Sequence, residues 1–427
     1  MNEQMEVIFG GYIGITDGKI TSISKTPPKE HPKEIIDAAG MIAMPGLINC
    51  HTELANTLLR NYMDDLPNKE ALEQLLQKEA VMNSRIAKDS ALLGIAECLR
   101  FGVTSVSDLY YYPDATAEAA DQAGIKANLA LSSYRFIDEN EDFDFETDEQ
   151  CQALKKTVEK WNGHDSGRIK IDAGIYAEYT SNYRLWEGLS SYALDAGLGM
   201  QFRLAQTKNE TESCLERTGL PQAELLDCHG MFSVPATVIG CTYLSDEEKR
   251  LMGRRKASAV ATPRASAKSG EVILPVQDCV KAGINVALGS GSVIDCGNTD
   301  LFEEMRSLAS QARQAAGSSD AMPASAVLMM ATVCGAKAQR RQGECGMLKP
   351  GMDADLILVD FTAPHLMPCH NVLSGLVFSA KGTDVAMTMV RGKILYQSGK
   401  FTTIDLNAVV KELMEYAIPQ LFQKSSD

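Results

Sequence analysis

The sequence predicts an α/β protein in which a closed (β/α)8 barrel of the TIM type carries a small β-sandwich built from both ends of the chain. Two observations support this prediction. Helical patterns alternate with short apolar strands over roughly 300 central residues, which is typical of a parallel sheet. Short β-type runs with turn residues flank this region on both sides. A doubly wound open sheet is the alternative, but no G-x-G-x-x-G segment follows an early strand.

The N-terminal part of the predicted sandwich consists of short apolar runs separated by glycine and proline. Asp17-Gly18 between two such runs is a strong hairpin signal. The predicted strands of this part are Val7–Ile8, Tyr12–Ile15, Lys19–Ile23, Ile35–Asp37 and Met41–Met44.

The barrel region repeats a unit of helix, glycine and strand. In the first clear copy we expect Asp89 to cap a helix, Gly102 to end it, and Val103–Val106 to follow as a strand. Ser245 and Glu248 form a capping box at the start of another helix. Further helix and strand pairs are Ala115–Ala123 with Ala127–Leu131, Leu185–Ala196 with Gly199–Leu204, and Val276–Ala282 with Ile284–Leu288.

The C-terminal part returns to short strands and ends in a helix. Strands are predicted at 355–360, 385–390 and 394–396, with a turn at 391–393, and a helix at 406–417. The predicted domain organisation is therefore residues 1–44 for the first part of the sandwich, 45–344 for the barrel, and 345–427 for the rest of the sandwich and the terminal helix.

Composition excludes several classes of protein. The 427 residues carry 41 Lys and Arg against 56 Asp and Glu, a net charge of −15, which is opposite to a nucleic-acid-binding surface. No apolar stretch of about 20 residues is present, and the 11 Cys form no CxxC pair. We expect a cytoplasmic protein with a small-molecule ligand, no nucleic-acid or membrane partner, and a possible homo-oligomeric state.

The end of the first predicted barrel strand carries the strongest motif, Pro45-Gly-Leu-Ile-Asn-Cys-His51-Thr-Glu53. It resembles the PGLINCHTH segment of the amidohydrolase superfamily, in its aminohydrolase branch of adenosine-type and cytosine- or guanine-type deaminases and of chlorohydrolases. The resemblance covers nearly the whole chain. It includes the segments 58–66, 96–104, 244–248, 283–289, 302–306 and 348–356.

The resemblance implies a zinc or iron ion that activates a water molecule for attack on an electrophilic ring carbon. In that family an HxH pair, a His on the fifth strand and an Asp on the eighth hold the ion. Of these four positions only His51 keeps its ligand here. The other matched positions, those of ligands, proton shuttle and orienting His residues, are occupied by Glu53, Tyr176, Arg203, Gln206, Gly240, Ala261 and Gly291.

These replacements predict that the metal site is lost. Arg203 has no lone pair to give a metal, and Gln206 cannot exchange a proton near neutral pH. We expect the Arg203 guanidinium to occupy the former metal position and to pair with Glu53. The sequence is accordingly interpreted as an amidohydrolase-like protein without cofactor and without zinc-dependent hydrolysis, retained for small-molecule binding or as a non-catalytic partner.

Two alternatives remain open. The protein is an active hydrolase or deaminase of C–N bonds in cyclic amidine or purine-like substrates with an unusual metal site, or an enzyme with metal-free chemistry based on Glu53, Tyr176, Arg203 and Glu178. The candidate substrate-binding residues, which follow or end predicted strands, are Asp108, Glu178 and Asp295.

Overall fold

The computed structural model describes residues 4–28, 32–66, 68–133 and 142–422. Within these residues eight parallel strands follow one another in chain order around a barrel. The barrel closes where the strand pair Thr52 and Gly291 forms a bridge, with the Gly291 N–H donating to the His51 carbonyl over 3.0 Å. The predicted (β/α)8 barrel is confirmed. Its strands are β4 (Leu47–Thr52), β5 (Val103–Tyr110), β6 (Lys126–Leu131), β7 (Ile169–Ala177), β8 (Met200–Leu204), β9 (Ala236–Gly240), β10 (Ser258–Ala261) and β11 (Asn285–Leu288).

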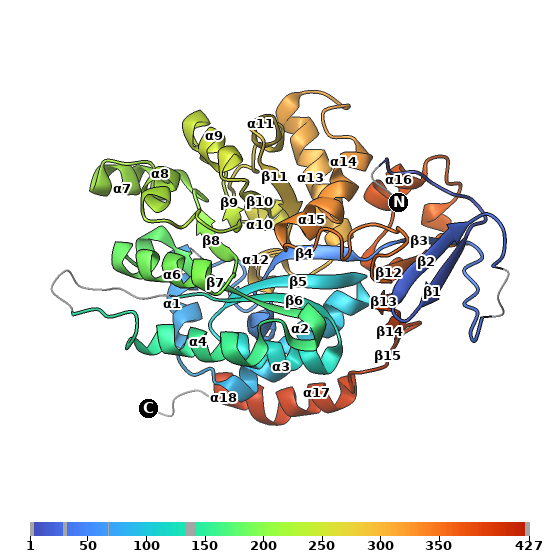
Figure 1. Ribbon diagram of the computed structural model, residues 1–427, viewed down its shortest axis with the longest axis horizontal. Helices are drawn as coiled ribbons and strands as arrows, with labels where there is room; N and C mark the ends of the chain where they lie inside the picture. Colours follow the sequence, from blue (N-terminus) through green and yellow to red (C-terminus); the bar gives the residue numbers. More distant parts are fainter. Residues whose placement is uncertain (1–3, 29–31, 67, 134–141, 423–427) are drawn as a thin grey trace.

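Helices cover the outside of the barrel (Figure 1). Some follow the strands closely, and others belong to longer connections at the carboxyl ends of the strands. They are α2 (Ser84–Arg100), α3 (Pro113–Ala123), α4 (Glu149–Trp161), α5 (His164–Gly167), η2 (Glu178–Thr180), α6 (Tyr183–Asp195), α7 (Lys208–Thr218), α8 (Gln222–Cys228), α9 (Asp246–Arg254), α10 (Pro263–Lys268), α11 (Val276–Lys281), α12 (Val293–Cys296), α13 (Leu301–Ala316), α14 (Ala324–Met330) and α15 (Val333–Ala338).

Local sequence signals explain where these helices begin and end. Gly124 ends α3 in the left-handed conformation at φ 84° and donates its N–H to the Ala120 carbonyl, as a C-terminal glycine does. Ser245 and Glu248 form the predicted capping box of α9. The predicted cap Asp89 is wrong: the helix is capped six residues earlier, by Asn83, whose side chain accepts from the N–H groups of Arg85 and Ile86.

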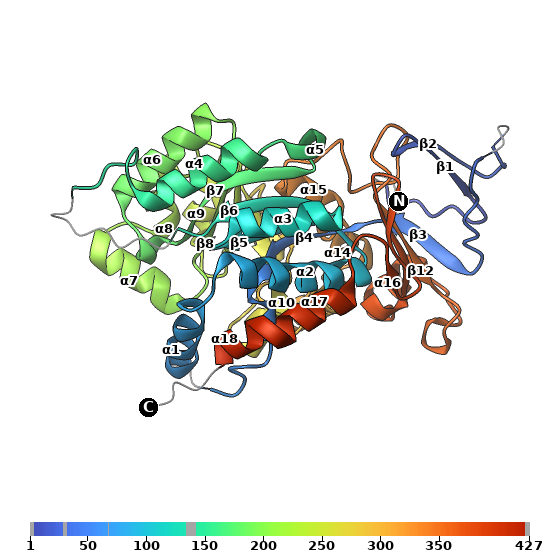
Figure 2. The same cartoon turned by 90° about the horizontal axis from the view of Figure 1, so that it is seen from below.

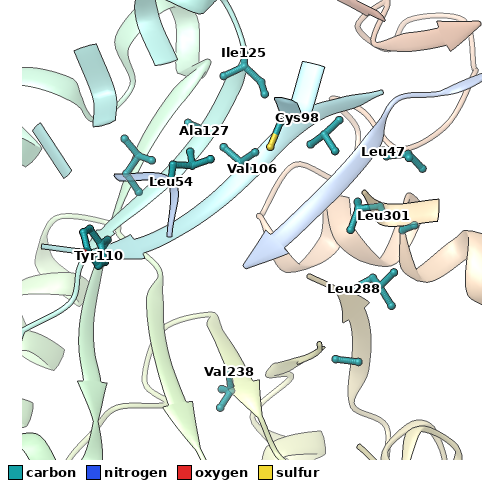
Figure 3. Packing of buried hydrophobic residues seen from close by; sticks show 14 of the residues in the cluster. Leu47, Leu54, Cys98, Val106, Tyr110, Ile125, Ala127, Val238, Leu288 and Leu301 are labelled. Atoms are coloured by element: carbon teal, nitrogen blue, oxygen red, sulfur yellow. The ribbon is translucent and has the colours of Figure 1, made fainter. Parts of the chain in front are cut away.

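The core lies between the strands and their helices and is formed mainly by aliphatic side chains. Val106 on β5 and Val238 on β9 are completely buried, and Ile125 is buried just before β6. Figure 3 shows these side chains together with Leu54 and Tyr110. Burial of this kind stabilises the barrel by roughly 25 cal/mol for each Å² of apolar surface removed from water.

Two antiparallel sheets form the smaller domain from both ends of the chain. One is the hairpin β1 (Tyr12–Thr16) and β2 (Lys19–Ser24), with Asp17 and Gly18 at its turn as predicted. The other has the order β15-β14-β13-β12-β3. Its strands are β3 (Met41–Pro45), β12 (Leu356–Asp360), β13 (Val385–Val390), β14 (Lys393–Gln397) and β15 (Lys400–Phe401). Three short helices lie between β12 and β13: η3 (Pro364–Leu366), α16 (Val372–Phe378) and η4 (Gly382–Asp384).

Two predicted N-terminal strands are wrong. Val7–Ile8 and Ile35–Asp37 carry no strand, and both segments lie largely in solvent, with Ile35 80% exposed. An apolar pair without a neighbouring strand to accept its hydrogen bonds gains nothing from the extended form.

The last described residues, up to Phe422, lie on the barrel rather than on the small domain. The predicted terminal helix forms as three consecutive segments, α17 (Leu406–Glu412), η5 (Leu413–Ala417) and α18 (Ile418–Phe422). Figure 2 shows them running along α2 towards α1 (Asn68–Glu79). The Lys78 ammonium of α1 donates to the Leu421 carbonyl over 2.9 Å. Among the described helices, none is both long enough and apolar enough to cross a membrane.

Candidate functional site

The carboxyl ends of the barrel strands bring together residues that are far apart in the sequence. His51 lies near the end of β4 and Glu53 follows it, while Arg203 is the fourth residue of β8. Arg203 Nη2 donates to Glu53 Oε1 in an ion pair that is almost buried, with 7% and 12% of the side chains exposed. The predicted Arg203–Glu53 pair is confirmed.

Neighbouring side chains fix this pair in place. Asn56, in η1 (Leu54–Leu59), donates to Glu53 Oε2 over 2.6 Å and to Ser292 Oγ over 2.9 Å. The Tyr176 ring from β7 lies 4.3 Å from the Arg203 Cζ atom and covers one face of the guanidinium. Burial lowers the pKa of Arg203, but the charge of Glu53 and the nearby hydroxyls of Tyr176, Tyr179 and Tyr111 together raise it by more, so the guanidinium stays charged.

Three polar atoms around the pair are buried without a hydrogen-bond partner: Arg203 Nη1, His51 Nδ1 and Asn56 Oδ1. Burial, and then the nearby Arg203 charge, lower the pKa of His51 well below its usual range, so its imidazole is neutral. An orphaned buried donor costs about 1–3 kcal/mol. Such groups call for an explanation when they gather in one place.

Carboxyl groups with raised pKa values surround the same pair. Burial raises the pKa of Glu79, at the end of α1, to about 7, although the Tyr110 hydroxyl donates to it over 2.7 Å. Burial likewise raises the pKa of Asp295, in α12, to about 6, with the Glu53 charge adding to the effect. Clustered carboxyls that titrate near neutrality are typical of active sites. We call His51, Glu53, Glu79, Arg203 and Asp295 the barrel mouth.

The other candidate substrate-binding residues have internal partners. Asp108 Oδ2 accepts from the Leu54 N–H over 2.6 Å and from Thr52 Oγ1 over 3.0 Å, which joins β5 to the turn after β4. Glu178 is fully buried and accepts from both Arg217 Nη atoms over 3.0–3.1 Å. Substrate contact by these two residues remains a prediction.

The matched positions on the later strands carry small side chains or none. Neighbouring residues pack tightly against Gly240: a Cβ there would lie 2.5 Å from Gln206 Cγ and 2.9 Å from the Leu204 carbonyl oxygen. At Gly291, with φ 78°, a Cβ would find its nearest neighbours, Ala265 and Thr262, at 3.8 Å. Ala261 is the last residue of β10. A role for Gln206 remains a prediction.

Sequence reasoning missed Glu79, Tyr110 and Asn56. The run Tyr110-Tyr111-Tyr112 at the end of β5 was the available signal, since residues at the carboxyl ends of barrel strands form the active site. For Glu79 no signal existed, because α1 stands apart from the repeating units of strand and helix. Two hollows in the described part of the chain lie away from the mouth, one of about 350 Å³ between α8 and α9 and one of about 260 Å³ beside η3 and α16.

The chain matches the amidohydrolase family over residues 42–395. It is 36% identical to the 5'-deoxyadenosine deaminase of Methanosarcina acetivorans, over 94% of this chain and 91% of that one. It is 34% identical to the 5-methylthioadenosine/S-adenosylhomocysteine deaminase of Caldicellulosiruptor saccharolyticus, over 95% and 93%. An adenosine deaminase from Xanthomonas campestris, solved with bound zinc, has a TM-score of 0.90 and 25% identity over 97% of this chain and 95% of that one.

These similarities contradict two expectations. The interpretation as a barrel without hydrolysis is wrong as a conclusion from the sequence, because relatives named as deaminases match along nearly the entire chain. The expectation of no cofactor is contradicted by the zinc in the Xanthomonas campestris structure. The substituted positions are few, whereas the similarity to relatives named as deaminases extends over the whole barrel.

The described residues of the mouth do not fit a zinc ion as they stand. Zinc requires three or four N, S or O donors around one point. Within the described ranges, no group of three or more His, Cys, Asp or Glu side chains is placed to hold a metal ion. The Arg203 cation lies against Glu53. The chemistry proposed below therefore uses only side chains of the mouth.

Proposed function

Because the chain belongs to the amidohydrolase family, we propose that it is a hydrolase of carbon–nitrogen bonds that removes the exocyclic amino group from a purine-type nucleoside. One observation carries this proposal: the two relatives with 36% and 34% identity, aligned over 94% and 95% of the chain, are both deaminases of adenosine derivatives. The polar, buried mouth at the carboxyl ends of the strands supports it.

The reaction consumes one water molecule. The water oxygen adds to the ring carbon that bears the amino group, the carbon–nitrogen bond breaks, and ammonia leaves with a proton that the water has given up. The ring then carries an oxo group, and the second proton of the water lies on the neighbouring ring nitrogen. A group that accepts the proton from water and returns it to the leaving nitrogen accelerates both steps, typically by 10²–10⁴-fold.

Glu79 has the properties that this proton transfer needs. Its pKa of about 7 allows the carboxyl group to take up and release a proton near neutral pH. The Tyr110 hydroxyl donates to Glu79 Oε1 and so holds the carboxyl in one orientation. Burial, and then the Glu79 charge, raise the pKa values of Tyr110 and Tyr111, which lie at the end of β5 beside the mouth. We assign Glu79 as the general base and acid.

Release of ammonia tests the proposal. The purified full-length protein, in parallel buffers with and without added Zn²⁺, is incubated with 5'-deoxyadenosine and 5-methylthioadenosine, and ammonia is measured by a coupled assay while the ring absorbance is followed. Ammonia and the oxo product should appear in equal amounts. Guanosine, whose amino group lies at another ring position, serves as a comparison substrate and should release ammonia at least 10-fold more slowly. Absence of ammonia from all adenosine derivatives would overturn the proposal.

A further inference from the structure

Arg203 and Glu53 use only part of their hydrogen-bonding capacity on each other. Arg203 Nη2 donates to Glu53 Oε1, whereas Arg203 Nη1 is buried without a partner in a residue that is only 6% exposed. Glu53 accepts from Arg203 and from Asn56, and a carboxylate has acceptor sites for about four donors. The pair therefore presents a spare donor next to a spare acceptor.

The geometry confines these spare positions to the plane of the guanidinium. The Tyr176 ring covers one face of Arg203 at 4.3 Å, so a ligand that approaches the N–H groups does so at the edge. Asn56, itself held by Ser292, fixes the Glu53 carboxylate at 2.6 Å. A donor and an acceptor held side by side in this way recognise a planar partner through two parallel hydrogen bonds.

Charge excludes an anionic partner. Three acidic residues of the mouth, Glu53, Glu79 and Asp295, interact electrostatically with Arg203. A carboxylate or phosphate ligand would have to approach these acidic groups, which repel it. A neutral planar ring avoids this repulsion and still satisfies the spare donor and acceptor.

We propose that Arg203 and Glu53 bind the edge of a neutral heterocycle that carries a hydrogen-bond acceptor directly beside a donor. Arg203 Nη1 donates to the acceptor, and the Glu53 carboxylate accepts from the neighbouring N–H. An amidine edge, with a ring nitrogen beside an amino group, fits this pattern, and so does a lactam edge, with an oxo group beside a ring N–H. The proposal rests on the proposed function, because deamination converts the first edge into the second.

Binding of two closely related nucleosides tests the edge without any variant. Inosine carries the lactam edge. 1-Methylinosine differs only in a methyl group that replaces the hydrogen on the ring nitrogen of that edge. In calorimetric titration of the full-length protein, inosine should bind at least 10-fold more tightly than 1-methylinosine, since a site built to bond a polar group rejects an analogue that lacks it. Equal affinities, or no binding of either nucleoside at millimolar concentration, would overturn the proposal.

One variant and its matched control test the role of Arg203. Arg203→Lys keeps the charge but loses the planar pair of donors that meets the oxo group, so inosine and 1-methylinosine should both bind at least 10-fold more weakly. Arg255→Lys is the matched control, because Arg255 forms an exposed pair with Asp227 and should leave both affinities unchanged. Unchanged affinity for inosine in Arg203→Lys, with a melting temperature near that of the original protein, would contradict the assignment.

The two proposals fail in different ways. Ammonia release by a protein that does not distinguish inosine from 1-methylinosine would overturn the edge and leave the deaminase function standing. A clear preference for inosine without ammonia release from any adenosine derivative would overturn the deaminase function and leave the edge standing.

Discussion

The two ends of the barrel bury charged groups in opposite ways. At the amino ends of the strands, which we call the barrel floor, Lys126 is fully buried and donates to Asp353 over 2.7 Å and to Asp355 over 2.5 Å. Arg341, also fully buried, makes five hydrogen bonds of 2.8–3.0 Å. At the barrel mouth Arg203 is almost as deeply buried, yet its Nη1 has no partner.

The difference separates stability from function. In barrels of this kind the amino-terminal face serves stability and the carboxyl-terminal face carries the active site. The floor joins β6 to the segment before β12, so its ion pairs connect the barrel with the small domain. The mouth keeps unpaired donors and acceptors that a ligand can use. Substitutions at the two ends should therefore affect different measured quantities.

The largest loss of stability is expected at the floor. Lys126→Met leaves Asp353 and Asp355 without their buried partner, and removal of one side of a buried ion pair costs about 3–5 kcal/mol of unfolding free energy. Urea unfolding measures it. As the control, Lys281→Met removes a pair whose lysine is 75% exposed and should cost less than about 1 kcal/mol. Similar losses for both variants would mean that the floor does not carry the stability assigned to it.

The mouth should show the reverse, a large loss of activity with little loss of stability. Glu79→Gln should lower kcat/KM for 5'-deoxyadenosine by roughly 100-fold or more, since the general base is lost. With the original protein, kcat/KM should fall as the pH drops below about 7, where Glu79 becomes protonated. This acid limb should vanish in the variant. The control variant Glu187→Gln removes a pair with His229 on the surface and should change neither kcat/KM nor its acid limb. An acid limb that persists in Glu79→Gln would refute the assignment of Glu79.

Removing both members of the mouth pair should have a small effect on folding. Arg203→Met combined with Glu53→Leu replaces a buried ion pair by apolar groups of similar size, which is often neutral or stabilising. We expect the unfolding free energy to change by less than about 1 kcal/mol or to rise, while inosine binding is lost. Loss of more than about 3 kcal/mol of unfolding free energy in the double variant would mean that the mouth pair stabilises the fold as strongly as the floor pairs do.

The pH dependence of stability should also have opposite signs at the two ends. Glu79 has a raised pKa, so the folded state holds a proton between pH 4.5 and about 7 that the unfolded state has lost, and stability increases as the pH falls through this range. At the floor, burial raises the pKa of Asp353, but the charges of Lys126 and Lys19 lower it by more, to about 2. The stability that the Asp353 carboxylate contributes is therefore lost as the pH falls from 3.8 towards 2.

The slope at the mouth is the smallest effect and is specific to one residue. One proton changes the unfolding free energy by at most about 1.4 kcal/mol for each pH unit. Urea unfolding between pH 5 and 7 should show a shallower slope in Glu79→Gln than in the original protein. An identical slope would show that Glu79 does not hold the proton.

The fold was predictable from the sequence because its signals are local. The hairpin at Asp17-Gly18, the capping box of Ser245 and Glu248, and the glycine that ends α3 each act within a few residues. The errors came where several local signals compete, as at Asp89 and Asn83, both of which can cap a helix.

The site was only partly predictable because it depends on long-range contacts. The Arg203–Glu53 pair could be inferred because the resemblance places these opposite charges at two positions that hold one metal ion in the family. Glu79 could not, since its contact with Tyr110 depends on how α1 folds over the mouth. The unpaired state of Arg203 Nη1 and His51 Nδ1 is likewise a property of packing that no sequence pattern records.

The distinction between the fully paired cations of the floor and the unpaired Arg203 Nη1 of the mouth is tested most directly by a crystal structure with inosine bound. Our account predicts an inosine oxygen or nitrogen within hydrogen-bond distance of Arg203 Nη1 and an inosine N–H facing the Glu53 carboxylate, with the floor contacts of Lys126 and Arg341 unchanged. Inosine bound elsewhere, with Arg203 Nη1 still unpaired, would contradict it.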